Sequence, residues 1–400
     1  MTLTVLLDLD DTLLINDLAA FLPAYLQALG GYLDEFPLDE TIRQIEAATW
    51  QMQQNKDPSK TLEDVFDSHF YSGLAIDKQD IGDKILGFYT EVFPTLQPYT
   101  RPNPGAKHLV DYLFDQGHRV IIATNPLFPR PATLQRLKWA GVAAEHYPFT
   151  LISTYERFHF SKPDPAYYIE LLAQAGWPPG PVVMIGDDFE MDIIPASCLD
   201  IATFWVHKER HPAIQSASPH SDNILDVIPW LEEVSGSLTE PPIDHPLAQL
   251  AVLRSTPAAF HTLTRDLTEP QWKYRADENE WSPAEVVCHL RDVDREVNWP
   301  RLNKVISEEN PFLPGVATDP WAQERQYIHE SGTQALADFI QVRNRITELL
   351  SALQPEDWRR IARHAIFGPT QIKELAGFIA THDRVHITQV FNVLQALKLR

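Results

Sequence analysis

Four short apolar runs constrain the fold of this chain more than any other feature of its sequence. Each run contains β-branched residues and is apolar on both faces, as buried strands of a parallel sheet are. The runs occupy residues 5–7, 119–124, 182–187 and 201–206. Helical patterns lie between them, for example 106–116, closed by Gly117, and 166–175, closed by Gly176. This alternation predicts a doubly wound, Rossmann-like α/β domain.

The segment of residues 16–99 interrupts this alternation between the first run and the second. It contains only helical patterns, such as 17–29, 38–54 and 62–71. Because the segment follows the first strand, we predict that it forms a helical cap over the carboxyl edge of the sheet. The α/β domain, residues 1–234, is expected to end after a last helix that begins near Asn223.

A polar, proline-rich stretch without periodicity covers residues 235–246, and it predicts a linker between two domains. From residue 247 to residue 400 the sequence contains no convincing buried strand. Four helical patterns follow one another there, at residues 247–267, 283–307, 332–353 and 370–398. This arrangement predicts a second, all-α domain that is a four-helix bundle.

Charge and cysteine content limit the classes of partner and compartment. The formal net charge of the 400 residues is −22, which argues against nucleic acid and anionic membranes because both require a basic face. Only two cysteines occur, Cys198 and Cys288, so a disulfide framework is excluded. We expect neither a membrane-spanning segment nor an N-terminal signal peptide, because no long apolar run occurs and the first residues lack a basic start. We therefore expect a cytoplasmic protein, with a homodimer left open.

Six polar side chains lie at or shortly after the carboxyl ends of the predicted strands, where open α/β sheets bind ligands, and a seventh, Lys162, lies just before a predicted helix. They are Asp8, Asp10, Thr124, Lys162, Asp187, Asp188 and Asp192. A carboxylate such as Asp8 can take up a phosphoryl group and form an acyl phosphate. Because the nucleophile and the substrate are both anionic, Asp8 and Asp187 are expected to hold a bridging Mg²⁺ ion. Asp10 can act as general acid and base, while Thr124 and Lys162 can hold the phosphoryl oxygens.

The order of these residues resembles the haloacid dehalogenase-like (HAD) hydrolase superfamily, over about residues 1–234. Four motifs carry the resemblance: Asp8-Leu9-Asp10-Asp11-Thr12, Thr124-Asn125, Lys162-Pro163 and Gly186-Asp187-Asp188-Phe189-Glu190-Met191-Asp192. It implies that Asp8 is the nucleophile and that Asp10 is the acid and base, with a backbone carbonyl that also binds the metal. In this family the second aspartate separates phosphatases from dehalogenases, which lack it, so Asp10 implies a phosphatase.

The same resemblance implies roles for the later motifs. Thr124 corresponds to the hydroxyl that binds phosphate, and Lys162 to the lysine that stabilises its charge. Asp187 corresponds to the metal ligand of the fourth motif, supported through water by Asp188 or Asp192. The helical segment 16–99 is similar to the C1 cap of the family, which closes over small soluble substrates and not over macromolecules.

Three histidines lie on apolar stripes of the predicted bundle. His289 shares its stripe with valines, on a helix that a capping box begins. His382 and His386 are four residues apart, on a face of the last helix that also carries Phe378 and Val385. Three inward imidazoles can bind a metal such as Zn²⁺, Ni²⁺ or Fe²⁺. Ordinary core histidines, held by hydrogen bonds, are the alternative explanation.

The segments 281–292 and 382–389 resemble the DinB/YfiT-like four-helix metal-binding family, over about residues 247–398. The resemblance implies a metal site made of His289, His382 and His386. Members include thiol-dependent transferases and many proteins of unknown activity, so a bound metal does not by itself imply a reaction. His329 and His364 occur in polar or loop-like contexts and are expected at the surface.

Three hypotheses about the whole chain follow from the two resemblances. In the first, a capped Mg²⁺-dependent phosphatase is joined to a metal-binding bundle. In the second, the bundle carries the main activity, a metal-dependent and thiol-dependent transfer. In the third, the bundle is a non-catalytic interaction module without metal.

Overall fold

The structure is a computed structural model that describes residues 1–207 and 219–397. The chain divides into two compact units, one made of Met1–Leu171 and Pro179–Pro241 and the other of Leu172–Pro178 and Pro242–Arg400. The boundaries expected from the sequence, 1–234, 235–246 and 247–400, stay a prediction. Among the helices that the structure describes, none is long and apolar enough to cross a membrane.

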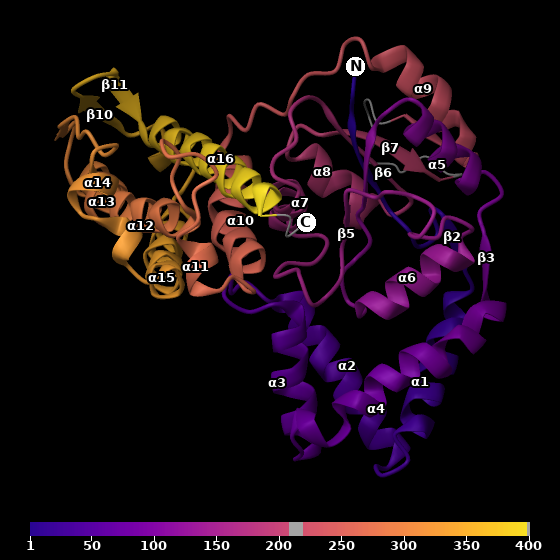
Figure 1. Ribbon diagram of the computed structural model, residues 1–400. Helices are drawn as coiled ribbons and strands as arrows, with labels where there is room; N and C mark the ends of the chain where they lie inside the picture. Colours follow the sequence, from indigo (N-terminus) through magenta and orange to yellow (C-terminus); the bar gives the residue numbers. More distant parts are fainter. Residues whose placement is uncertain (208–218, 398–400) are drawn as a thin grey trace. The chain divides into compact units, whose positions relative to one another are not determined.

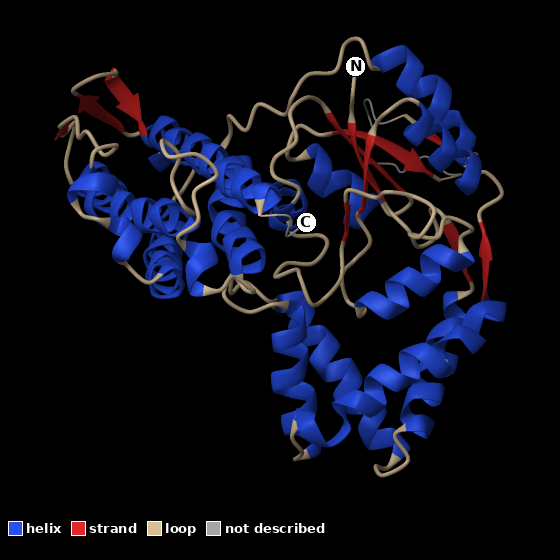
Figure 2. Cartoon of the chain, in the orientation of Figure 1, coloured by secondary structure: helices blue, strands red, loops and turns tan. Residues whose placement is uncertain are grey.

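The first unit contains a six-stranded parallel sheet (Figures 1 and 2). Its strands, in spatial order, are β5 (Leu151–Ile152), β4 (Arg119–Ile122), β1 (Thr4–Leu7), β6 (Val182–Gly186), β7 (Ala202–Val206) and β8 (His220–Ser221). Leu7 at the end of β1 pairs with Ile122 of β4 and Ile185 of β6. The strand order reverses at β1, and a ligand crevice is expected at the carboxyl ends of the strands at such a point.

Five helices follow the strands of this sheet in the chain. They are α5 (Ala106–Asp115), α6 (Arg130–Trp139), α7 (Pro165–Gln174), α8 (Ile194–Ser197) and α9 (Val227–Val234), with a π-helical turn η2 (Phe189–Ile193) and a 3-10 turn η3 (Ile224–Asp226). Gly117 has a φ of 72°, and this conformation lets the chain turn back after α5. β1 and β6 are completely buried, as the short apolar runs predict. The predicted doubly wound α/β fold is therefore confirmed.

A helical cap is inserted between β1 and β4. It consists of α1 (Leu18–Tyr32), α2 (Leu38–Gln54), α3 (Leu62–Leu74), α4 (Lys78–Glu91) and the 3-10 helix η1 (Phe93–Tyr99), which gather at one end of the unit in Figure 2. The chain enters the cap through β2 (Leu14–Asn16) and leaves it through β3 (Thr100–Pro102), and these two strands pair antiparallel. Both cap connections therefore lie next to each other, and β2 follows the segment Asp8-Leu9-Asp10-Asp11-Thr12 closely in the chain.

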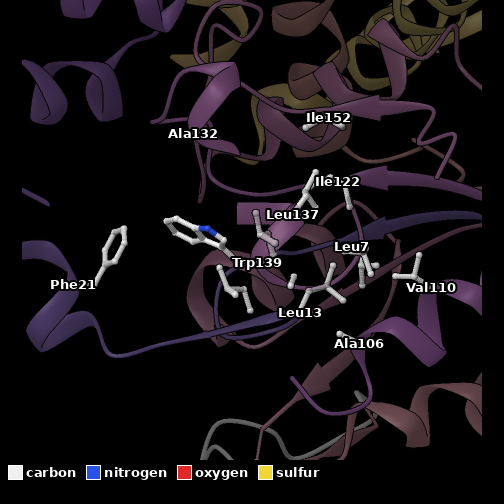
Figure 3. Packing of buried hydrophobic residues seen from close by; sticks show 14 of the residues in the cluster. Leu7, Leu13, Phe21, Ala106, Val110, Ile122, Ala132, Leu137, Trp139 and Ile152 are labelled. Atoms are coloured by element: carbon white, nitrogen blue, oxygen red, sulfur yellow. The ribbon is translucent and has the colours of Figure 1, made fainter. Parts of the chain in front are cut away.

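The hydrophobic core of the sheet continues into the cap through aromatic contacts (Figure 3). Trp139 at the end of α6 lies edge-on to Phe21 of α1, with ring centroids 6.5 Å apart, and stacks on Phe93 at 5.2 Å. The backbone of the cap also bonds to the core, because the Leu62 amide donates to the Phe158 carbonyl at 2.7 Å. These contacts hold the cap against the α/β part of the unit.

Four long helical segments form the second unit, as predicted. They are α10 (Pro246–Thr264), α12 (Pro283–Val293) continued by the π-helical turn η4 (Asp294–Asn298) and by α13 (Trp299–Ser307), α15 (Gly332–Ser351) and α16 (Ile372–Ala396). Short turns complete the unit: α11 (Glu269–Trp272), α14 (Trp321–Glu324), η5 (Tyr327–His329) and η6 (Asp357–Arg359). The Ser282 hydroxyl accepts from the Glu285 amide, and the Glu285 carboxylate accepts from the Ser282 amide, so the capping box begins α12.

Two predictions about the second unit are wrong. The unit contains a small sheet in the order β11 (Gly368–Gln371), β10 (Ile361–His364) and β9 (Phe312–Leu313), whereas the sequence predicts no strand there. His364, expected at the surface, is only 5% exposed. Its Nδ1 accepts from the amides of Ile366 and Phe367, at 3.2 and 3.4 Å, and these bonds hold the ring inside the turn between β10 and β11.

Candidate functional site

Lys162 lies at the centre of the polar cluster at the carboxyl edge of the sheet. Its ammonium Nζ lies 2.6 Å from Asp8 Oδ1 and 2.5 Å from Asp192 Oδ1, and all three side chains are buried. The Lys162 amide also donates to Asn125 Oδ1 at 3.3 Å, which ties the loop before α7 to the loop after β4. Lys162 therefore contacts residues that follow three strands: Asp8 after β1 and Asp192 after β6 through its ammonium, and Asn125 after β4 through its backbone amide.

Asp187 follows β6 directly and faces the same cluster. One oxygen each of Asp8, Asp187 and Asp192 lie within 4.8 Å of one another. The Thr12 hydroxyl donates to Asp187 Oδ1 at 3.2 Å, and the Trp205 indole donates to the Asp187 backbone carbonyl at 2.6 Å. Sequence reasoning missed both Thr12, which supports the carboxylate, and Trp205, which holds the backbone of Asp187.

Gly186 makes room for Asp192. A Cβ atom at position 186 would lie 2.3 Å from Asp192 Oδ2, closer than any real contact. The Asp188 amide donates to that same oxygen at 3.2 Å. The glycine before Asp187 is therefore required by the close approach of the Asp192 carboxylate, not by a positive φ.

The cluster contains three carboxylates, those of Asp8, Asp187 and Asp192, and one ammonium group, that of Lys162. Burial, and then the charges of Asp8 and Asp192, raise the pKa of Asp187 to about 9. Burial raises the pKa of Asp192 to about 7 even though Lys162 opposes the shift. Burial alone would lower the pKa of Lys162, but Asp192 and Asp8 hold that pKa well above its usual value. Three hard oxygen donors beside one ammonium fit a divalent cation such as Mg²⁺.

Asp10 lies beside the cluster, with a half-buried carboxylate. The Thr124 hydroxyl donates to Asp10 Oδ2 at 3.4 Å, and the Asn16 side-chain amide donates to Asp10 Oδ1 at 3.1 Å. The carbonyl of Thr124 accepts from the hydroxyls of Tyr167 and Ser153, at 2.6 and 2.7 Å. The loop after β4 is thus held so that the Thr124 side chain lies next to the first motif.

Arg136 of α6 forms an ion pair with Asp10 that the sequence analysis missed. The guanidinium is buried, and it lies over the rings of Phe21 and Phe128 at 5.7 and 5.2 Å from their centroids. Burial lowers its pKa to about 10, which leaves the group charged at neutral pH. A signal was present, because Arg136 lies four residues after Ala132 on the buried face of the helix, where a charged residue needs a partner.

Two further acids of the motifs lie outside the cluster. The carboxylate of Asp188 accepts from the amides of Glu190 and Met191, both at 2.9 Å, and so begins the turn η2. Asp11 has a φ of 54° in the turn after β1, and its carboxylate accepts from the Asn16 amide at 2.7 Å. Of the two residues expected to support Asp187, Asp192 is in contact with the cluster and Asp188 is an N-cap.

The three predicted bundle histidines converge in the second unit. Nε2 of His382 lies 3.1 Å from Nε2 of His289 and 3.1 Å from Nε2 of His386. His386 Nδ1 lies 2.9 Å from Gln389 Oε1, which can only accept, so this contact places the ring proton on Nδ1. The lone pair of His386 Nε2 therefore points toward the other two rings.

Burial keeps these imidazoles neutral. It lowers the pKa of His289 to about 3, with the two neighbouring histidines adding to the shift, and lowers the pKa of His382 and His386 to about 4. Trp281 covers the site, with its ring parallel to that of His386 at 5.7 Å. Three neutral nitrogens at one point are a donor set that fits a transition metal.

Other residues near the histidines differ from the sequence analysis. Phe378 and Val385, assigned to the same inward face as His382, are 42% and 60% exposed. They lie at the margins of the apolar stripe of α16, outside its buried face. His329 is exposed, as expected, and Cys288 is completely buried.

Family models match both units of the chain. The model described as haloacid dehalogenase-like hydrolase matches residues 2–200, and the DinB superfamily model matches residues 253–390. The chain joins a HAD-like hydrolase domain to a DinB-superfamily domain. Both family predictions and the predicted fold class are therefore confirmed, and the HAD-like domain is that of a hydrolase.

Known proteins resemble one domain or the other. The uncharacterized protein YuaE of Bacillus subtilis (strain 168) is 24% identical over 147 residues, which cover 34% of this chain and 90% of YuaE. YfiT from Bacillus subtilis, a four-helix bundle of unusual topology, is 19% identical over 38% of this chain and 87% of its own, with a TM-score of 0.36.

Solved HAD structures include enzymes of two kinds. A HAD phosphatase from Thermococcus onnurineus is 17% identical, with a TM-score of 0.39, over 58% of this chain and 98% of its own. A 2-haloacid dehalogenase from Pseudomonas syringae pv. Tomato DC3000 is 20% identical, with a TM-score of 0.42, over 58% of this chain and 99% of its own.

Proposed function

We propose that the HAD-like domain hydrolyses a small phosphate monoester, with Asp8 as the nucleophile. An oxygen of Asp8 attacks phosphorus, the bond from phosphorus to the alcohol oxygen breaks, and Asp10 gives that oxygen a proton. In the second step Asp10 takes a proton from water, whose oxygen attacks the same phosphorus and releases inorganic phosphate from Asp8. Both steps balance without a further reactant.

Asp10 is the observation that carries the proposal. It is a second carboxylate beside Asp8, hydrogen-bonded to the Thr124 hydroxyl and paired with Arg136. The dehalogenases of this family have no acid at that position, and their reaction needs no proton for the leaving group. A carboxylate held there by two other residues therefore supports ester cleavage.

The remaining residues of the cluster bind and orient. Lys162 is fixed between Asp8 and Asp192, so its ammonium lies where phosphoryl oxygens would meet the nucleophile. The Thr124 hydroxyl offers a further donor on the Asp10 side. When bound by Asp8 and Asp187, with the Asp10 carbonyl as a further donor, Mg²⁺ would offset the repulsion between the carboxylates and the phosphate.

Replacing Asp8 with Asn tests this function. The variant keeps the shape of the side chain but loses the nucleophile, so phosphate release should disappear for every ester in a panel of phosphorylated metabolites. Asp11→Asn is the matched control, since asparagine tolerates the positive φ of position 11 and can keep the bond to Asn16. Unchanged turnover in Asp8→Asn, with Mg²⁺ present, would end the proposal.

For the DinB-like domain we propose a transition-metal site made of His289, His382 and His386. The convergence of three Nε2 atoms of neutral imidazoles supports it. Zn²⁺, Ni²⁺ and Fe²⁺ suit such ligands. Elemental analysis of protein loaded with each metal should find about one ion per chain, and none in His382→Ala. A chain that takes up no metal would instead support the interaction-module hypothesis.

The transferase hypothesis has its own signature. It predicts a metal-dependent activity toward a low-molecular-weight thiol that survives Asp8→Asn and is lost in His382→Ala. We also propose that the protein works in the cytoplasm on a small molecule and without a nucleic-acid partner, which the net charge of −22 and the free Cys198 and Cys288 support.

A further inference from the structure

A cavity lined mainly by helices of the cap has mostly apolar walls. The cavity has a volume of about 330 Å³, within the range of small-molecule sites. Its walls consist of seven aromatic side chains, seven aliphatic or proline side chains, and only Glu46, Thr49 and Gln53 as polar ones. No lysine, arginine or histidine is among the residues that line this cavity. It therefore offers no partner for a second phosphate or a carboxylate of a ligand.

Two neighbouring side chains link one side of this cavity to Asp10. Phe128 lines the cavity, and the Arg136 guanidinium lies 5.2 Å from the centre of its ring. Arg136 in turn is paired with Asp10. Phe128 also belongs to the loop after β4, which contains Thr124. One aromatic ring and one guanidinium thus connect the cavity to the acid of the proposed reaction.

The position of Asp10 decides which part of a substrate faces the cavity. In the proposed reaction Asp10 gives its proton to the alcohol oxygen, so the leaving alcohol lies on the Asp10 side of the phosphorus. That is the side of Arg136 and Phe128. The phosphoryl group itself stays with Asp8 and Lys162, which lie 2.6 Å apart. The remainder of the substrate therefore extends toward the cavity and not away from it.

Two of the hydroxyls that line the cavity are satisfied by each other. The hydroxyls of Tyr25 and Tyr89, both buried, are hydrogen-bonded at 2.8 Å. Trp50 and Leu22 are 57% and 50% exposed and lie at the outer part of the wall. A sugar, with a hydroxyl on nearly every carbon, would leave most of its hydrogen bonds unmade against such walls. An aromatic or branched apolar group would not.

We propose that this cavity binds the leaving group of the substrate, and that this group is an uncharged, mainly apolar alcohol or phenol of about one to two rings. The inference rests on the proposed phosphatase reaction and narrows its substrate class. It predicts that sugar phosphates and nucleotides, which carry many hydroxyls or a second charge, are poor substrates. The preference belongs to α1, α2 and the loop after β4, because these elements supply most of the walls.

Kinetics with matched esters test the substrate class. The full chain with Mg²⁺ should hydrolyse 1-naphthyl phosphate with a kcat/KM at least ~10-fold above those for glycerol 2-phosphate and glucose 6-phosphate, since a few apolar groups are worth that much. Trp50→Ala should reduce this preference mainly through KM. Leu38→Ala on the same helix is the control, because Leu38 is 40% exposed and does not line the cavity.

Binding of 1-naphthol to Asp8→Asn separates this inference from the proposed reaction. Calorimetry should find one site per chain, weakened ~10-fold or more by Trp50→Ala and unaffected by Leu38→Ala. Naphthol binding without turnover of any ester by the wild type would support the cavity and contradict the phosphatase. Absence of naphthol binding, or equal kcat/KM for naphthyl and glucose esters, would overturn the cavity proposal while leaving phosphate release intact.

Discussion

At the scale of single residues, Gly186 is a position of the candidate site where a side chain has no room. An alanine Cβ would lie 2.3 Å from Asp192 Oδ2, so Gly186→Ala must push that carboxylate away from Lys162. Because supports of metal ligands are worth about 10–100-fold in metal affinity, the variant should need ~10-fold more Mg²⁺ for half-maximal activity. A Mg²⁺ titration of phosphate release measures this.

The matched control for that variant is Gly236→Ala. A Cβ at Gly236 meets nothing within 4 Å, so its Mg²⁺ dependence should be that of the wild type. An unchanged Mg²⁺ requirement in Gly186→Ala would show that Asp192 contributes little to the cation site, and the ligand set would then reduce to Asp8 and Asp187.

Arg136 gives a second prediction at this scale. Arg136→Leu removes the partner of Asp10 and should lower kcat by at least ~10-fold, because a misplaced general acid loses much of its 10²–10⁴-fold contribution. Arg136→Lys keeps the charge but not the planar group over Phe128, so its kcat should fall between those of the wild type and Arg136→Leu. KM should change less than kcat. Equal kcat values in steady-state assays of all three proteins would refute a positioning role for Arg136.

These residues also show what the sequence could and could not predict. Asp8, Thr124 and Asp187 end neighbouring parallel strands, and strand ends meet at one edge of a sheet, so their convergence follows from the pattern. Arg136 lies on a helix whose rotation about its own axis depends on packing against Phe21 and Phe128. A sequence motif contains no information about such packing. The one sequence signal was an arginine on the buried face of the helix, which indicates a buried partner of opposite charge.

At the scale of elements, one buried arginine connects three helical segments of the DinB-like domain. Arg343 of α15 donates from Nε to Asp294 of η4 at 2.7 Å and from Nη2 to Asp383 of α16 at 3.0 Å. All three side chains are at most 1% exposed. Arg343→Met would leave two carboxylates buried without a cation, so the free energy of unfolding should fall by about 3–5 kcal/mol.

Urea denaturation followed by circular dichroism measures that loss. Arg345→Met, two residues further along α15, is the control, because Arg345 is exposed and its loss should change stability by less than about 0.5 kcal/mol. Asp383 is also the neighbour of His382 in the chain, so the Arg343 variant should lose metal affinity as well. A variant as stable as the control would mean that the three charges contribute nothing net.

Helices and short strands of this chain differ in how well the sequence predicts them. The long helices carry many periodic apolar residues, and their bounds were predicted to within a few residues. β9 and β10 have two and four residues, too few for a period-two pattern to stand out, and β11 contains Gly368 and Pro369. The small sheet depends on pairing between these short strands, and β9 lies far from β10 in the sequence, so no local pattern predicts the pairing.

At the scale of the whole molecule, the chain carries two candidate cation sites whose ligand atoms differ in chemistry. Carboxylate oxygens of Asp8, Asp187 and Asp192 suit a hard ion, whereas the three imidazoles of the DinB-like domain suit a borderline one. Each site is built from residues of one unit alone. The two ions should therefore stabilise different units of the same chain, and this difference can be measured without knowledge of any substrate.

Thermal unfolding of the full chain with Zn²⁺ at about 100 times its dissociation constant tests this separation. Binding to the native state alone adds about 2.7 kcal/mol, which for a domain of this size shifts one transition upward by roughly 5–11 °C. His382→Ala should abolish the Zn²⁺ shift because it removes the imidazole in contact with both others, whereas Asp187→Asn should keep it. A Zn²⁺ shift that survives in His382→Ala but disappears in Asp187→Asn would place the ion among the carboxylates and refute the histidine site.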